Sequence, residues 1–151
     1  MKSTAFWMGL AGALAIAAGI GLFLIQTRYS DNVAVLAARV DRDCAPWDGS
    51  AFTLSIPVEG EPGAMIVISI WRSPDFKLPV TFSFPDEAGG VGNAIYRPAF
   101  GPDEPLSGRV SFRRVELGRP VEGRFDLTSE SGDQFSESFE AEWGATTIAC
   151  G

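Results

Sequence analysis

Carboxylates are the most plentiful side chains able to do chemistry in this 151-residue chain, which contains 19 acidic residues and no histidine. Without imidazole the chain cannot build a Ser-His-Asp or Cys-His nucleophile, a histidine-ligated zinc or copper site, or a histidine axial ligand for haem. Paired carboxylates can catalyse glycoside hydrolysis, but no spacing in the sequence singles out a pair. We therefore predict that the protein is not an enzyme, and we assign it no catalytic residue and no cofactor.

Two short segments resemble ligand-binding motifs only weakly. Asp41, Asp43 and Asp48 offer oxygen atoms for calcium, but their segment lacks the length and the glycine placement of a calcium loop. The glycine-rich run 89–92 lacks the Gly-Lys-Ser/Thr that a phosphate loop requires. We predict neither a metal site nor a nucleotide site.

The chain contains two cysteines, Cys44 and Cys150, which bracket its last two thirds. A single pair that brackets a whole domain is typical of an oxidising compartment. A disulfide that closes a loop of about 100 residues contributes about 4–5 kcal/mol in the chain-entropy model. We predict this disulfide; the alternative is two unrelated buried thiols.

The charged residues are distributed unevenly along the chain. All 19 acidic residues but only ten of the 12 basic ones lie from Asp31 onward, so this part is strongly acidic. Nucleic-acid phosphates and anionic headgroups bind lysine and arginine, so we expect no nucleic acid and no anionic lipid surface as a partner of this part. Basic partners and divalent cations remain compatible with its charge.

Residues 5–25 contain no charged side chain. A helix of this length matches a hydrocarbon core about 30 Å thick, so we predict a single membrane span after a short tail, 1–4. The alternative is a cleavable signal peptide, since Lys2 supplies a basic start. The apolar run exceeds the usual hydrophobic region of a signal peptide, about 7–15 residues, which favours the uncleaved anchor.

The basic residues do not decide the orientation of this span, because Lys2 precedes it while Arg28, Arg39 and Arg42 follow it. The predicted disulfide places the following domain outside the cytoplasm. Abundant alanine, glycine and arginine with only two lysines indicate a GC-rich bacterial gene. We therefore predict a single-pass protein of the bacterial inner membrane with a cytoplasmic N-terminus and a periplasmic C-terminal domain.

Small residues repeat every four positions along the predicted span and form two neighbouring rows. Such rows let helix backbones approach closely in lipid. We predict a helix-packing interface with other integral membrane subunits; the alternative is that alanine and glycine are frequent because of base composition. The rows consist of Gly9, Ala13, Ala17 and Gly21, and of Ala11, Ala15 and Gly19.

Residues 26–43 are predicted to form a juxtamembrane stalk that is partly helical. Between Asp31 and Arg42 the apolar residues recur at helical spacing, and Asp31 or Asn32 can cap such a helix. The alternative is a solvent-facing linker. The regularly spaced apolar residues are Val33, Leu36, Ala37 and Val40.

Residues 44–151 alternate between apolar and polar side chains and carry regular turn signals. About seven or eight short strands of this kind predict an all-β antiparallel sandwich, with a small β-barrel as the alternative. Glu137 falls on the inward side of the last expected strand and indicates an edge or a bulge. The expected strands cover 51–58, 64–71, 79–84, 109–113, 121–128 and 134–143.

The segment 86–106 is rich in glycine and proline and also carries Tyr96, Arg97 and Phe100. Two interpretations are open. Long loops in compact domains are often functional, and exposed aromatics beside an arginine are typical of interfaces, which predicts an interaction loop. Alternatively, residues 93–97 form a further strand whose aromatic side chain belongs to the core.

Two functions fit these features. The leading hypothesis is a non-catalytic accessory subunit of a bacterial inner-membrane complex, which docks by its span and covers the periplasmic side of larger subunits with its acidic β-domain. The alternative is a membrane-tethered periplasmic binding module for a peptide, glycan or lipid. A concave apolar pocket in the β-domain would favour the binding module.

Overall fold

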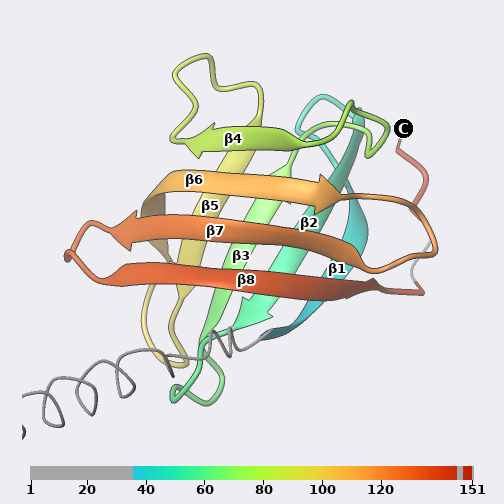
Figure 1. Cartoon of the computed structure of the whole chain (residues 1–151). Coiled ribbons are helices and arrows are strands. Elements are labelled where there is room, and N and C mark those ends of the chain that lie inside the picture. The colour runs from blue at the N-terminus through green and yellow to red at the C-terminus, as the bar shows by residue number, and fades with distance from the viewer. Residues whose placement is uncertain (1–35, 146–147, 151) are drawn as a thin grey trace, which may run out of the picture. The chain divides into compact units, whose positions relative to one another are not determined.

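The computed structural model describes residues 36–145 and 148–150. The predicted tail, the membrane span with its two rows of small residues, and residues 26–35 of the predicted stalk lie outside this part of the chain. Among the described residues, no helix is both long enough and apolar enough to cross a bilayer. The described part is all β, as predicted, and Figure 1 shows its eight strands. They are β1 (Leu36–Cys44), β2 (Ser50–Pro57), β3 (Met65–Ile70), β4 (Val80–Phe84), β5 (Gly92–Arg97), β6 (Glu104–Arg114), β7 (Val121–Ser129) and β8 (Gln134–Trp143).

The strands form one sheet that closes into a barrel (Figure 1). Seven of them follow one another in the order β6-β5-β3-β2-β1-β8-β7. The last of these, β7, pairs with the first, β6, and this pairing closes the ring. The remaining strand, β4, pairs with β6. All pairs are antiparallel except β1 with β8, which is parallel. The barrel alternative is confirmed, and the preferred sandwich is wrong.

The length of β6 explains why the sheet closes. Residues 104–105 of β6 pair with β5, residues 108–112 pair with β4, and along its other edge residues 106–114 pair with β7. A sandwich needs two separate sheets, whereas β6 pairs with β5 on one edge and with β7 on the other and so joins the two ends of the strand order into a closed ring. The register shift between Phe112 and Arg114 increases the local bend of this strand.

The first strand, β1, corrects the predicted stalk. Its residues 36–44 form a strand, so the helix expected between Asp31 and Arg42 is wrong from Leu36 onward. Ala38 and Val40 are buried while Arg39 between them is exposed, which is the two-residue period of a strand. Pairing with β2 on one edge and β8 on the other outweighs the helical spacing of the apolar residues. The β-domain therefore begins earlier than residue 44.

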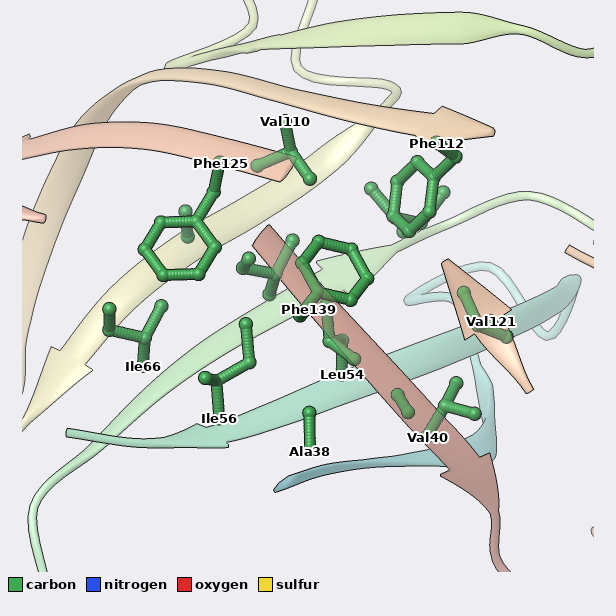
Figure 2. Packing of buried hydrophobic residues seen from close by; sticks show 14 of the residues in the cluster. Ala38, Val40, Leu54, Ile56, Ile66, Val110, Phe112, Val121, Phe125 and Phe139 are labelled. Carbon is green, nitrogen blue, oxygen red and sulfur yellow. The ribbon is translucent and has the colours of Figure 1, made fainter. Parts of the chain in front are cut away.

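Large apolar side chains fill the interior of the barrel. Figure 2 shows Phe112, Phe125 and Phe139 lying between strands that also contribute Leu54 and Ile56. All five are at most 2% exposed, and the rings of Phe112 and Phe139 meet edge to face with centroids 5.8 Å apart. Truncating one such phenylalanine costs about 3–5 kcal/mol. Because the interior is filled, a binding site must lie on the outside or at an end of the barrel.

Glu137 is half-buried and pairs with Phe125 on β7. The pairing of β7 with β8 shows no register shift at this point. No bulge in the pairing of β7 with β8 therefore accounts for this inward-facing carboxylate.

The loops gather at two ends of the barrel, to which we give names. The disulfide end consists of the loops 45–49, 71–79 and 115–120 and of the described residues after Trp143. The hairpin end consists of the loops 58–64, 98–103 and 130–133. Strand β1 runs from the hairpin end to the disulfide end.

Candidate functional site

A disulfide joins Cys44, the last residue of β1, to Cys150, and the two Cα atoms lie 5.6 Å apart. This confirms the predicted pair. Asp43 braces the neighbouring backbone, because its carboxylate accepts hydrogen bonds from the Cys44 N–H at 2.8 Å and from the Thr53 hydroxyl at 2.7 Å. The bond ties Cys150 to the first strand and closes a large loop. In the chain-entropy model it lowers the entropy of the unfolded chain and so raises the free energy of unfolding by about 4–5 kcal/mol.

Beside this disulfide lies a half-open hollow of about 480 Å³. Its walls come from both ends of the described sequence and from the loops 71–79 and 115–120, so only the closed barrel brings them together. It is lined by Arg42, Asp43, Ser50, Ala51, Ser73, Pro74, Asp75, Val115, Glu116, Leu117, Trp143, Ile148 and Cys150.

The apolar wall of the hollow is exposed to water. Leu117 is 49% exposed and Ile148 is 38% exposed, whereas the neighbouring Val115 is buried. Isolated exposed apolar side chains are common on protein surfaces, whereas these two line the same hollow. The wall can therefore accept an apolar group from a partner.

Hydrogen bonds hold the loop 115–120 that carries this wall. The indole Nε1 of Trp143 donates to the backbone carbonyl of Glu116 at 2.9 Å. The guanidinium of Arg114 donates to the carbonyl of Pro120 at 2.9 Å and also pairs with the carboxylate of Glu122. These contacts restrain both ends of the turn 115–120.

The charged residues that line the hollow are three carboxylates, Asp43, Asp75 and Glu116, and one guanidinium, Arg42, and we call this set the rim. The hydrogen-bond donors on Asp43 are neutral, so they leave its negative charge uncompensated. Glu116 lies 3.5 Å from Arg119 in an exposed ion pair, which screens its charge only partly. The hollow thus combines an apolar wall with a negatively charged rim.

The predicted interaction residues lie at or near the hairpin end, and the structure decides between the two interpretations of their segment. Residues Gly92–Arg97 form β5, so the strand alternative is confirmed for this part. Tyr96 is half-buried, its ring stacks on Phe135 with centroids 5.3 Å apart, and its hydroxyl donates to Glu61 at 2.5 Å. This hydrogen bond is the main reason that the pKa of Tyr96 rises to about 12.

The other two predicted interaction residues differ from each other. Arg97 forms a two-pronged ion pair with Asp103 at 2.7 Å and 2.9 Å, and the hydrogen bonds from Arg97 lower the pKa of the Asp103 carboxyl. Phe100 is 94% exposed at the tip of the loop 98–103. The structure therefore leaves only Phe100 of the three available as an apolar contact, and it does not bring Phe100 to the hollow.

The glycine-rich run 89–92 has a structural role. The carboxylate of Asp86 accepts hydrogen bonds from the N–H groups of Gly90 at 2.9 Å and Val91 at 3.0 Å, which lowers the pKa of Asp86. Gly92 has a φ of 148°, and a Cβ atom there would lie 1.8 Å from the Ser69 carbonyl oxygen. The glycines thus allow a tight turn and a close strand contact.

Among residues 36–145 and 148–150, no three or more Asp, Glu or Cys side chains are grouped closely enough to hold a metal ion. Asp41, weighed as a calcium ligand, instead pairs with Arg39 at 2.8 Å. In the same residues, no buried side-chain nitrogen or oxygen lacks a hydrogen-bond partner.

The sequence analysis did not identify the hollow. Leu117 carried one signal, because a large apolar residue stands there inside the polar turn Glu116–Arg119. Trp143, which lines the hollow, also packs against Phe52, with ring centroids 6.2 Å apart. No protein-family model, no curated protein and no solved structure matches this chain.

Proposed function

We propose that the protein is a non-catalytic binding module that is tethered to a membrane by residues 5–25 and binds a partner at the disulfide end of its barrel. The observation that carries the proposal is the hollow of about 480 Å³ with Leu117 and Ile148 on its wall. Its volume falls in the range of about 300–1,000 Å³ that is usual for ligand sites. This concave apolar site favours the binding module over the leading hypothesis from the sequence.

Rigidity of the site supports the same proposal. Ile148 lies two residues before Cys150, whose disulfide to Cys44 restrains the end of the chain. The loop 115–120, which carries Leu117, is restrained by the hydrogen bond from Trp143 to Glu116. A site that is formed before its ligand arrives avoids much of the entropy cost of binding.

In this proposal the protein is a single-pass protein of the bacterial inner membrane, with the barrel on the periplasmic side. An oxidising periplasm would keep Cys44 and Cys150 joined. The absence of histidine from the sequence supports a role in binding rather than catalysis.

A second candidate, the accessory subunit of an inner-membrane complex, is favoured by the two rows of small residues along the predicted span. Rows of this kind promote helix association in lipid. In that case the span makes the main contact with the complex, and the hollow makes at most a secondary one.

The decisive experiment compares two exposed apolar residues at opposite ends of the barrel. The full-length chain and its Leu117→Ser and Phe100→Ser variants are purified from mildly solubilised native membranes, and the proteins that accompany them are quantified by mass spectrometry. We expect Leu117→Ser to lose the partner and Phe100→Ser to keep it. Equal retention by both variants would refute binding at the disulfide end.

The same preparation tests the accessory-subunit candidate. Replacing the row Gly9, Ala13, Ala17 and Gly21 by leucine should release the partner if the span makes the main contact, because the added bulk separates the helices. The control variant adds comparable bulk elsewhere on the span through Leu10→Phe and Leu14→Phe. If the row variant keeps its partner, the span serves only as an anchor.

A further inference from the structure

The charges around the hollow at the disulfide end indicate what kind of group it accepts. Asp43, Asp75 and Glu116 face one basic residue, Arg42, so the rim is net negative. Asp75 forms no ion pair among the described residues, and its side chain is exposed. A cationic group placed at the rim would therefore gain attraction without first breaking a contact of Asp75 with its own chain.

We infer that the hollow binds a peptide segment of a partner protein in which an apolar side chain is followed or preceded by lysine or arginine. This inference rests on the proposed function and names the class of its ligand. The apolar side chain occupies the space between Leu117 and Ile148, and the cationic side chain faces Asp75 and Asp43. The hydroxyls of Ser50 and Ser73 offer hydrogen bonds to the peptide backbone.

The chemistry of the rim distinguishes a peptide from a phospholipid. The phosphate of a phospholipid headgroup would meet a rim of three carboxylates and one guanidinium, whose net negative charge repels it. The acidic composition of the whole chain from Asp31 onward adds to this repulsion at long range. A basic, apolar peptide is attracted by the same field and also buries the exposed wall.

The test uses three capped tripeptides that differ only in the central residue, which is cationic, neutral or anionic: Leu-Arg-Leu, Leu-Gln-Leu and Leu-Glu-Leu. Each is titrated into the full-length chain in a neutral detergent, and binding is followed through the NMR signals of the Trp143 indole and the Leu117 methyl groups. We expect affinity to fall in that order. The step from arginine to glutamine should be about fivefold, the upper range for one exposed ion pair, and it should shrink at high salt.

Two isosteric variants give the matched control. Asp75→Asn should weaken the arginine peptide by up to about fivefold and leave the glutamine peptide unchanged. Asp126→Asn removes an equally exposed carboxylate from the outer face of β7, away from the hollow, and should change neither affinity. Equal binding of all three peptides, or no effect of Asp75→Asn, would overturn the inference.

Failure of the inference is distinguishable from failure of the proposed function. If no tripeptide binds while Leu117→Ser still releases the native partner, the peptide class is wrong and the binding site stands. If Leu117→Ser keeps the native partner and no tripeptide binds, both proposals are wrong.

Discussion

At the hairpin end of the barrel, Tyr96 and Arg97 are each held by a carboxylate of their own chain, Glu61 and Asp103. At the disulfide end, Asp75 has no such ion pair in the described residues, and Leu117 faces water on the wall of a hollow. Residues of the interface-forming types are present at both ends. At the hairpin end only Phe100 is free to meet a partner, whereas at the disulfide end Leu117 and Ile148 are both exposed beside the hollow.

The difference follows from how each end is stabilised. The hairpin end uses polar side chains to hold its loops, so these side chains cannot bind a partner without losing an internal contact. The disulfide end uses a covalent bond, a backbone carbonyl and a half-buried arginine to hold its loops. Exposed aromatics and arginines therefore indicate a binding surface only where their own chain does not already engage them.

The largest expected effect comes from removing the covalent tie at one end. The double variant Cys44→Ser with Cys150→Ser should lower the free energy of unfolding by up to about 4–5 kcal/mol, because the unfolded chain regains the entropy of a large loop. Urea unfolding of the full-length chain measures this loss. Hydrogen exchange should increase at the disulfide end and stay unchanged in the hairpin 130–133; equal loss of protection at both ends would contradict independent stabilisation.

A smaller effect is expected when either of the two arginines that hold loops, Arg114 and Arg97, is replaced, and its size should differ between the two ends. Arg114→Met at the disulfide end should cost about 1.5–3 kcal/mol, because a charge-assisted contact is lost and the carbonyl of Pro120 loses its donor. Arg97→Met at the hairpin end should cost less than about 1 kcal/mol, because its ion pair is solvent-exposed. Chemical denaturation of both variants measures the two losses in the free energy of unfolding. Equal costs would mean that the two ends do not differ in how they use polar contacts.

The smallest expected effect is a pH dependence that belongs to the hairpin end. The pKa of Tyr96 is raised to about 12 in the folded chain, above the value of about 10 for a free tyrosine. The stabilisation of the folded chain by the protonated Tyr96 and its hydrogen bond to Glu61 is therefore fully present below about pH 10. It is lost as the pH rises from about 10 to about 12. Glu61→Gln should lower the pKa of Tyr96, measured by tyrosinate absorbance, whereas Glu59→Gln should leave it nearly unchanged.

Assignment of this titration requires the variant Tyr96→Phe, because the chain contains two tyrosines. The absorbance change that disappears in this variant belongs to Tyr96. If that change is centred near pH 10 in the unmodified chain, the hydrogen bond to Glu61 does not hold the ring in solution. The hairpin end would then be as free to bind as the disulfide end.

Strands whose side chains alternate were predictable, because β2, β4, β7 and β8 each bury one face against a single core. The first strand was not, since its short apolar residues fit helical spacing as well, and only pairing with β2 and β8 makes it a strand. The first half of β6 was missed for a similar reason. Pro105 and Gly108 lower its strand propensity, yet it pairs with both β5 and β7.

By itself the sequence determined the all-β class and the cysteine pair, because alternation and a lone pair of cysteines are local or compositional signals. It also determined the acidic charge and the lack of any imidazole. Only the tertiary structure decided that the sheet closes through β6, that Tyr96 is engaged and that Leu117 and Asp75 share a hollow. These outcomes depend on contacts between residues far apart in the chain, and neither spacing nor composition records which of those contacts form.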